Sequence, residues 1–476
     1  MQTIETDVAI LGAGTAGLAA RRAALEHTPR VVVIEPGPHG TTCARVGCMP
    51  SKLLIAAAEA AHVARDAGPF GVRVAGVEID GDAVMDRVRR ERDRFVGFVL
   101  EAVESWPPGQ RVDGRARFVA PDLLQVDEHT QVRAGRIVIA TGSRPRVDPR
   151  LRDALGDRLI VNDDVFAWRT LPRSVAVIGA GVIALEIAQA LHRLDVRVHV
   201  YARATRVGPL TDPALQAETA RVLGAELRIT RDAAALSLRR AGDEVVVRHA
   251  SEPEERFEWA LVATGRAPNV EGLGLEHAGL ALDAHGVPRH DRTTMRCGDS
   301  AVFIAGDVDD DTPLLHEAAD GGRIAGDNAG RYPDVRVRPR RAALAVAFTS
   351  PQLAIAGRSH ASLLAADVPF ETGSVSFEDQ GRSRVMRRNQ GRLHIYGQRG
   401  TGRVLGAELI GPDAEHLAHL VAWSVQRGDT VQQMLDAPFY HPVVEEGLRT
   451  ALRDLQARLK LGPQPAENCL DCGPGT

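Results

Sequence analysis

Short runs of β-branched residues along this chain are followed by longer runs rich in alanine. Residues 8–11 form one such apolar run, which leads through a glycine-rich turn into an alanine-rich segment, so strand, turn and helix are expected in that order. A second apolar run follows at 31–34. The same succession returns at 175–178 and 196–200. The pattern therefore predicts two α/β units of one design.

The turn after the first strand of each unit has a glycine pattern typical of dinucleotide binding. In the first unit it reads Gly-x-Gly-x-x-Gly, and the next strand ends in Glu35. This spacing places a pyrophosphate at a helix N-terminus and a carboxylate at a ribose hydroxyl. Each unit also closes with an apolar strand followed by Ala-Thr-Gly. The candidate nucleotide-binding residues are Gly12, Gly14, Gly17, Glu35, Thr141 and Gly142 in the first unit, and Gly179, Gly181, Ala184 and Gly265 in the second.

The two units are expected to bind different nucleotides. Position 202 corresponds to Glu35 in its distance from the glycine pattern, but it is alanine, and Arg203 and Arg206 lie close to it. Guanidinium groups favour a 2′-phosphate, and NADH would require a carboxylate at this place. The second unit is therefore predicted to bind NADPH, with NADH as the alternative because arginine is abundant throughout the chain.

Cys43 and Cys48 form a candidate thiol pair with four residues between them. In an ideal helix their Cα atoms would be roughly 8 to 9 Å apart, too far for a disulfide, so pairing requires a distortion that Gly47 can supply. Pro50 suits the first turn of a helix, and a Cys48 thiolate at that helix start would have a lowered pKa. These residues alone fit either a redox pair or two ordinary reduced cysteines.

The composition narrows the class of protein. With 58 basic and 62 acidic residues, the formal net charge is −4, which offers no basic surface for nucleic acid. No apolar run approaches the length of a membrane span, so no membrane contact and a cytoplasmic location are expected. Five cysteines, an odd number, argue against a secreted disulfide framework and favour a redox-active pair. No resident metal site is predicted.

Three further motifs follow the glycine turns and the thiol pair. Residues 302–307 read Val-Phe-Ile-Ala-Gly-Asp, residues 348–351 read Phe-Thr-Ser-Pro, and His441 begins the run His-Pro-(x)₃-Glu that ends at Glu446. With these motifs in this order, the chain resembles the pyridine nucleotide–disulfide oxidoreductases, the family of dihydrolipoyl dehydrogenase, glutathione reductase and mercuric reductase. The resemblance runs from about residue 5 to about residue 455.

The resemblance implies an α/β fold with two Rossmann-like dinucleotide-binding domains, for FAD and NAD(P), and a C-terminal α+β dimerisation domain. It therefore implies a homodimer. FAD would also contact Gly306 and Asp307 of the second FAD motif. The expected domains are 1–150 for FAD, 151–272 for NAD(P), 273–340 for the return to the FAD and central domain, 341–460 for the interface domain, and 461–476 for a flexible C-terminal arm.

The family's catalytic roles would fall on four residues. Cys48 would be the charge-transfer thiol beside the flavin, and Cys43 the interchange thiol that attacks the substrate disulfide. His441, contributed by the other subunit, would act as acid and base, with Glu446 orienting it. Imidazole suits this role because its pKa lies near neutrality.

Lys52 would complete the flavin site in this family. It lies one helical turn after Cys48, hence on the same face, and would pair with Glu186 near the flavin and the nicotinamide. Arg45 and Val443 depart from the family pattern, which commonly has asparagine and threonine there. The identity of the disulfide substrate, small molecule or protein, and the direction of electron flow therefore stay open.

The C-terminal arm carries a second cysteine pair, Cys469 and Cys472, after a Pro/Gly-rich segment. Their Cys-x-x-Cys spacing suits a disulfide or two soft-metal ligands. High-molecular-weight thioredoxin reductases and mercuric reductases resemble this layout. Besides a dihydrolipoyl-dehydrogenase-like reductase, the alternatives are a relay to a larger disulfide, a reductase of a thiol-bound metal ion, and a non-catalytic FAD protein.

Overall fold

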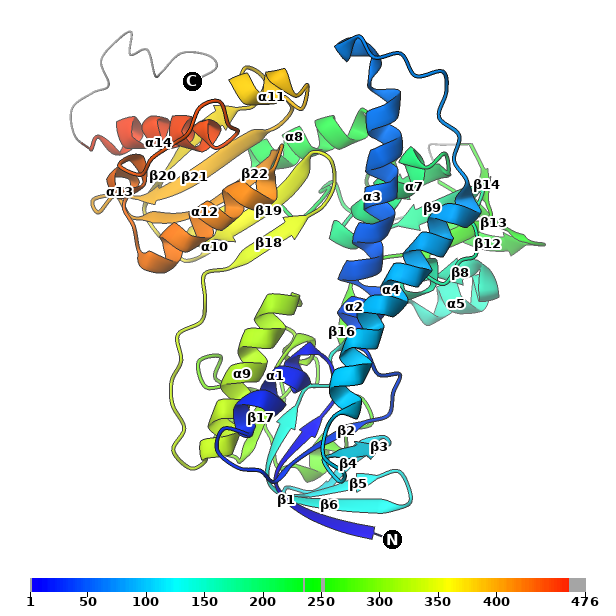
Figure 1. The fold of residues 1–476 in the computed structure, drawn as a ribbon, viewed down its shortest axis with the longest axis vertical. Coiled ribbons are helices and arrows are strands. Elements are labelled where there is room, and N and C mark those ends of the chain that lie inside the picture. The colour runs from blue at the N-terminus through cyan, green and yellow to red at the C-terminus, as the bar shows by residue number, and fades with distance from the viewer. Residues whose placement is uncertain (1, 234–235, 250–252, 462–476) are drawn as a thin grey trace.

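The computed structural model describes residues 2–233, 236–249 and 253–461 (Figure 1). Three large sheets, each packed against helices, organise the structure: the first lies at the lower end of Figure 1, and the second and third lie side by side in its upper half. The two predicted α/β units form the first two sheets, and the third belongs to the C-terminal part. The predicted fold class, two dinucleotide-binding α/β units followed by an α+β domain, is confirmed.

The first sheet has strand order β3-β2-β1-β6-β5-β4, and β17 pairs with β6. Its centre is parallel, because β1 pairs in parallel with β2 and β6. The chain thus returns to this sheet after building the second one. The strands are β1 (Gln2–Leu11), β2 (Val31–Glu35), β3 (Arg111–Asp113), β4 (Ala116–Ala120), β5 (Leu123–Val126), β6 (Thr130–Ile139) and β17 (Val302–Ile304).

Alternate residues of β1 fill two different cores. Val8 and Ile10 pack on one face with α1 (Thr15–Ala24) and α9 (Leu315–Arg331), whereas Ala9 and Leu11 pack on the other. All four side chains are buried, so β1 reads as a continuous apolar run. This arrangement leaves the glycine turn after Leu11 at the carboxyl end of the strand, where α/β sheets bind ligands.

The second sheet has strand order β11-β10-β9-β15-β8 and is parallel. An antiparallel sheet of three strands, β12-β13-β14, lies beside it. The strands are β8 (Leu159–Ile160), β9 (Ser174–Ile178), β10 (Arg197–Tyr201), β11 (Ile229–Thr230), β12 (Ser237–Ala241), β13 (Glu244–Arg248), β14 (Glu255–Phe257) and β15 (Trp259–Val262). The helices of this part are α5 (Pro149–Leu155), α6 (Asn162–Val165), α7 (Val182–Arg193) and α8 (Pro213–Gly224).

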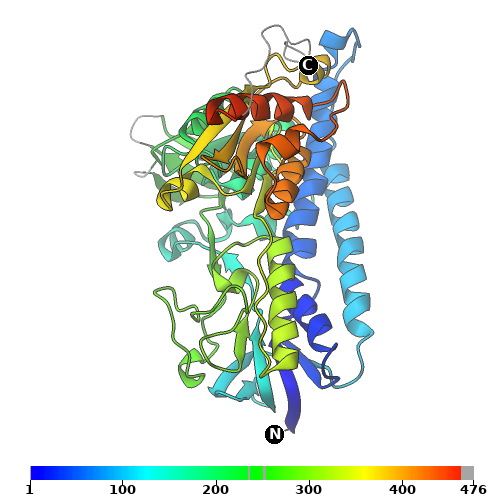
Figure 2. The same cartoon turned by 90° about the vertical axis from the view of Figure 1, so that its left-hand side faces the viewer.

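Two connections join the first and second sheets. The chain leaves the first sheet through β7 (Ser143–Pro145) and returns through β16 (Arg266–Pro268), and these strands pair with each other. Two long helices, α3 (Cys48–Arg65) and α4 (Gly81–Glu104), run side by side along the molecule, as Figure 2 shows. Apolar residues of both helices pack into the core of the second sheet. The thiol pair at the start of α3 therefore lies where the two units meet.

The third sheet is antiparallel, with strand order β18-β19-β22-β21-β20. Its core is shared with the helices around it, of which α12 and α14 contribute most. The elements are β18 (Leu344–Ala347), β19 (Gln352–Gly357), α10 (His360–Ala365), β20 (Phe370–Ser376), α11 (Gly381–Val385), β21 (Arg392–Gln398), β22 (Val404–Gly411), α12 (Ala414–Arg427), α13 (Val431–Leu435) and α14 (Glu446–Leu459). The domain boundaries expected near residues 150, 272 and 340 stay a prediction.

Candidate active site

Cys43 and Cys48 lie on two consecutive helices separated by one glycine. Cys43 belongs to α2 (Thr42–Val46), and Cys48 is the first residue of α3. Gly47, between them, has φ −122° and ψ −119°, so the helix breaks where the sequence predicts a distortion. A Cβ at Gly47 would lie 3.2 Å from the Cα of Cys43. Both cysteines are free thiols, Cys48 being exposed in the subunit and Cys43 half-buried.

The two thiols differ sharply in acidity. The hydrogen bond from Cys43 is the main cause that lowers the pKa of Cys48 to about 6; burial opposes this shift, and the nearby ammonium of Lys52 adds to it. The same hydrogen bond, together with burial, raises the pKa of Cys43. Near neutral pH the dithiol pair therefore holds a thiolate on Cys48 and a proton on Cys43.

Lys52 and Glu186 form an ion pair beneath the thiols. The Nζ of Lys52 lies 2.8 Å from Oε2 of Glu186, whose side chain is buried on α7. The other oxygen, Oε1, accepts a hydrogen bond from the backbone N–H of Phe348 at 2.8 Å. The ammonium also lies 4.6 Å from the centre of the Phe348 ring. The sequence indicates Phe348 only as part of the motif at 348–351, and the fold brings it next to Lys52 and Glu186.

The glycine turn of the first unit borders a cavity of about 470 Å³. A Cβ at Gly12 would lie 2.4 Å from the carbonyl oxygen of Ala140, and one at Gly17 would lie 1.9 Å from that of Gly12. Gly14, in contrast, faces open space. Two of the glycines thus permit close backbone packing, and the third leaves room for a ligand at the start of α1.

Glu35 lines this cavity and is held by two backbone donors. Its carboxylate accepts hydrogen bonds from the N–H of Ala13 at 2.8 Å and of Gly37 at 3.0 Å. Thr141 and Gly142 line the same cavity, as does Arg45 of α2. A carboxylate for a ribose, a helix N-terminus for a pyrophosphate and a cavity of this size fit the adenosine half of FAD.

Asp307 belongs to a polar cluster between the two units. It accepts a hydrogen bond from the hydroxyl of Ser143 at 2.8 Å, and Nε of Arg266 donates to the same hydroxyl at 2.8 Å. Gly306 has φ +80°, and a Cβ there would lie 2.8 Å from that of Ala16. The paired strands β7 and β16 thus bring Arg266 to Ser143, whose hydroxyl contacts Asp307, and no local sequence pattern indicates these contacts.

The second glycine turn repeats the geometry of the first. A Cβ at Gly179 would lie 2.4 Å from the carbonyl oxygen of Ala263, whereas Gly181 faces open space at the start of α7. Ala184 is fully buried in that helix, and Gly265 follows β15 with φ +116°. Arg203 and Arg206, the predicted phosphate ligands, are exposed just after β10.

His441 and Glu446 lie together at the start of α14. Nδ1 of His441 is 3.1 Å from both carboxylate oxygens of Glu446, which is buried, whereas 63% of the His441 side chain is exposed. Arg449, one turn further along α14, donates to Glu446 at 3.1 Å. The i+3 spacing of Glu446 and Arg449 could have indicated that contact. In the part of the chain that the structure describes, Nε2 of His441 has no hydrogen-bond partner, and most of the ring is exposed.

The other predicted cysteines fall into two groups. Cys297 is buried in the core of the first sheet, where burial raises its pKa to about 12. Cys469 and Cys472 lie outside the described residues. In the described ranges, no group of three or more His, Cys, Asp and Glu side chains could hold a metal ion, and no helix is long and apolar enough to cross a membrane.

Known proteins show the same organisation as this chain. Residues 6–322 match the pyridine nucleotide-disulphide oxidoreductase family, and residues 344–452 match its dimerisation domain. A mercuric reductase from Acidithiobacillus ferrooxidans is 30% identical over 96% of this chain and 84% of its own length. A dihydrolipoyl dehydrogenase from Chlamydia trachomatis is 28% identical over 92% of this chain and 94% of its own length. The solved structure of LpdA from Mycobacterium tuberculosis superposes with a TM-score of 0.81 at 26% identity, covering 94% of this chain and 99% of that one.

Two dinucleotide units and a dimerisation domain define a flavoprotein oxidoreductase of the FAD- and pyridine-nucleotide-dependent class, whose enzymes act on sulfur groups. The chain belongs to the pyridine nucleotide-disulphide oxidoreductase family.

Proposed function

We propose that this protein is an FAD-dependent NAD(P)H:disulfide oxidoreductase of the dihydrolipoyl dehydrogenase type. The observation that carries the proposal is the thiol pair at the start of α3, in which Cys48 has a pKa lowered to about 6 and lies near the Lys52–Glu186 ion pair. A stable thiolate beside a protonated partner is the arrangement that thiol–disulfide exchange requires.

FAD would be held by the first glycine turn, Glu35 and Asp307, and the nicotinamide nucleotide by the second turn. Bound FAD would supply the conversion between a two-electron hydride transfer and thiol chemistry. The ammonium of Lys52 and the helix start at Cys48 would stabilise negative charge on the sulfur that faces this cofactor. We assign Glu35 and Asp307 to cofactor binding, and Lys52 to positioning of charge beside the cofactor.

In the reducing direction, Cys43 would attack the substrate disulfide. Because its pKa is raised, it needs a base, and we assign that role to His441 of the partner subunit, which takes the thiol proton. A bond forms between Cys43 and one substrate sulfur, and the other sulfur leaves and takes the proton from the imidazolium. The Cys48 thiolate then attacks Cys43, which closes the Cys43–Cys48 disulfide and releases the second substrate thiolate.

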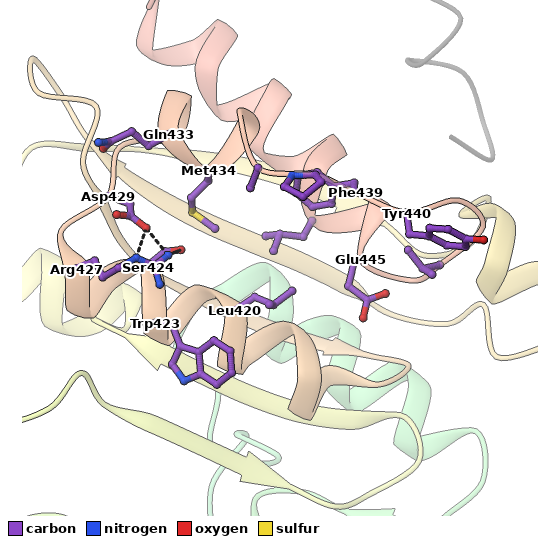
Figure 3. Close-up of a pocket in the computed structure, with 14 residues that line it drawn as sticks. Leu420, Trp423, Ser424, Arg427, Asp429, Gln433, Met434, Phe439, Tyr440 and Glu445 are labelled. Atoms are coloured by element: carbon purple, nitrogen blue, oxygen red, sulfur yellow. Dashed lines mark hydrogen bonds and ion pairs between the residues drawn. The ribbon is translucent and has the colours of Figure 1, made fainter.

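The exposure of His441 supports the homodimer. Beside it lies a cavity of about 400 Å³ lined by α12, α13 and the chain before α14 (Figure 3). Trp423 and Tyr440, both lining this cavity, are 58% and 79% exposed. Large aromatic side chains on the dimerisation domain are typical of a protein interface. We propose that a second copy of the chain covers this surface.

For the nucleotide we propose NADPH, with NADH as the competing donor. Arg203 and Arg206 are exposed after β10, where a 2′-phosphate would lie, and the ribose-binding carboxylate of the first unit has no counterpart at Ala202. A cytoplasmic location remains part of this proposal, because a working thiol pair needs a reducing compartment.

The test is anaerobic reduction of the purified flavoprotein with NADPH and with NADH, followed by a panel of disulfides that includes lipoamide, glutathione disulfide and a protein disulfide. We expect faster flavin reduction by NADPH and turnover of at least one disulfide. A protein that binds FAD but is reduced by neither nucleotide would contradict the proposal and favour the non-catalytic alternative.

A second candidate function is delivery of electrons through Cys469 and Cys472 to a bulky disulfide or a thiol-bound metal ion. The observation that favours it is the 30–31% identity to proteins named mercuric reductase, together with the Cys-x-x-Cys spacing. Truncation after Pro465 should spare lipoamide reduction but impair turnover of a protein disulfide or of thiol-bound Hg²⁺. Equal rates for both forms on every substrate would mean that the arm is dispensable.

A further inference from the structure

The two parallel sheets can be matched residue by residue at their nucleotide-binding edges. In the first sheet the N–H of Gly12 donates to the carbonyl of Ile34 at 2.8 Å, and in the second the N–H of Gly179 donates to that of Tyr201 at 2.9 Å. Each bond joins the first glycine of the turn to the neighbouring strand. Ile34 and Tyr201 therefore occupy the same place in the two units.

The residues that follow these matched positions differ in charge between the two sheets. In the first sheet, the residue after Ile34 is Glu35, and it pairs in register with Asp113 of β3. In the second sheet, Tyr201 pairs with Thr230 of β11, so the following positions are Ala202 and Arg231. Two adjacent carboxylates in the FAD unit thus correspond to an alanine and a guanidinium in the other unit. Arg231 was not recognised from the sequence, because β10 and β11 are far apart along the chain.

The backbone fixes Arg231 beside Ala202. The N–H of Ala202 donates to the carbonyl of Thr230 at 2.8 Å, and the N–H of Ala233 donates to the carbonyl of Ala202 at 2.9 Å. These two bonds lie on either side of Arg231 in the chain. Its Cα position relative to β10 is therefore set by main-chain pairing.

The loop that carries Arg203 and Arg206 is closed against the same glycine turn. It begins after Tyr201, which accepts from Gly179, and it ends where the N–H of Gly208 donates to the carbonyl of Ala180 at 2.8 Å. The loop with Arg203 and Arg206 therefore borders the glycine turn, and Arg231 lies beside Ala202, the residue that precedes Arg203.

Within the described residues, the side chains of these three arginines have no polar partner. Arg203, Arg206 and Arg231 are all exposed, and within the described residues none of them forms a hydrogen bond or ion pair. Elsewhere in the chain, clustered arginines are paired with carboxylates; Arg336, Arg338, Arg340 and Arg341 all contact Asp or Glu side chains. A phosphate dianion would give these unpaired guanidinium groups the anionic partner that they otherwise lack.

We propose that Arg231 is a third residue that determines nucleotide specificity, binding the 2′-phosphate of NADPH together with Arg203 and Arg206. This inference rests on the proposed function, because it presumes that the second unit binds a nicotinamide dinucleotide. It adds the residue that directly follows β11. It explains the preference by the opposite charges of Asp113 in the first sheet and Arg231 at the matching position of the second.

The test uses 2′,5′-ADP and 5′-AMP as probes of the adenosine end alone, titrated by calorimetry into the FAD-loaded protein without any electron acceptor. We expect Arg231→Ala to weaken 2′,5′-ADP binding about tenfold, equal to about 1.4 kcal/mol, and to change 5′-AMP binding by less than about twofold. Arg231→Asp places a carboxylate where the first sheet has Asp113, and it should weaken 2′,5′-ADP binding further.

Arg173→Ala is the matched control. Arg173 is 89% exposed and lies just before the amino end of β9, whereas the glycine turn follows the carboxyl end of that strand. Arg173→Ala therefore removes the same charge at a place away from the nucleotide. It should change neither affinity. Equal losses for both probes with Arg231→Ala, or no loss for either, would overturn the role of Arg231 and leave the reductase proposal standing. Failure of the unaltered protein to bind either probe would overturn both.

Discussion

At the scale of single residues, the thiols of Cys43 and Cys48 owe their difference in acidity to their neighbours. Cys48 begins a helix, receives a hydrogen bond from Cys43 and lies close to Lys52, all of which favour its thiolate. For Cys43 the same hydrogen bond, together with burial, raises the pKa, and the nearby Lys52 only partly opposes this rise. One sulfur is thus prepared to carry negative charge, and the other needs a base before it can attack.

The lowered pKa of Cys48 predicts its reactivity. In the anaerobically reduced protein, alkylation of Cys48 by iodoacetamide should increase with pH and reach half its maximum near pH 6, since only the thiolate reacts. Lys52→Met removes a nearby positive charge and should move that midpoint to higher pH. Mass spectrometry of the peptide that contains Cys48 measures both. A midpoint above about pH 8 in the unaltered protein would contradict the assignment.

Replacement of Cys48 by serine tests its role directly. We expect Cys48→Ser to abolish disulfide reduction and the long-wavelength absorption that a thiolate gives beside a flavin, while FAD stays bound. The physical reason is that a hydroxyl remains protonated where the thiol ionises. Cys297→Ser is the control, because Cys297 is buried in a core away from the pair. Normal turnover with the absorption band intact in Cys48→Ser would refute the role.

At the scale of elements, the FAD unit depends on the close packing of α1 against α9. A Cβ at Gly322 would lie 2.2 Å from the carbonyl oxygen of Ala16, and one at Gly326 would lie 2.1 Å from that of Ala20. Glycines four residues apart on α9 thus let the two helices approach to backbone contact. The helix whose N-terminus borders the nucleotide cavity is positioned by this contact.

Gly326→Ala should therefore destabilise the protein, although alanine is the better helix former. The added methyl group meets backbone at Ala20, and such overpacking costs about 1–3 kcal/mol. Gly97→Ala, in α4 with open space around it, should instead be neutral or stabilise by up to about 1 kcal/mol. Thermal or urea unfolding of both variants measures the difference. Equal stability would mean that α9 can shift away from α1 without loss.

At the scale of the whole molecule, the thiol pair and His441 lie in different parts of the subunit. The thiol pair lies between the first two sheets, whereas His441 projects from the third part of the chain and exposes most of its ring. The cavity beside His441, with Trp423 and Tyr440 at its edge, is the surface that we assign to the second subunit. If the sites are shared as we propose, separated subunits should be inactive.

Subunit mixing tests the shared site. Cys48→Ser and His441→Ala homodimers should each be inactive in disulfide reduction. Co-expression should restore about a quarter of the unaltered activity, because about half of the dimers are mixed and each of those has one complete site. Separating the mixed dimers by two different affinity tags makes the measurement direct. Inactive mixed dimers would place His441 in the site of its own subunit.

Local sequence patterns determined much of this protein. The glycine turns, the strands before them and the break at Gly47 depend on backbone conformation and on neighbours a few residues apart, and the structure has them where the sequence predicts them. The residue-level roles of Cys43, Cys48 and His441 came from a resemblance between motifs and remain proposals.

Tertiary structure decided the contacts between distant segments. Lys52 and Glu186 are 134 residues apart, and the sequence indicated their ion pair only through the family resemblance. Phe348 beside Lys52, Arg266 beside Ser143 and Arg231 beside Ala202 were not indicated at all. Local periodicity specifies which face of an element is buried, but it holds no information on which remote element covers that face. That choice is made by the packing and strand register of the folded chain, which bring such residues together.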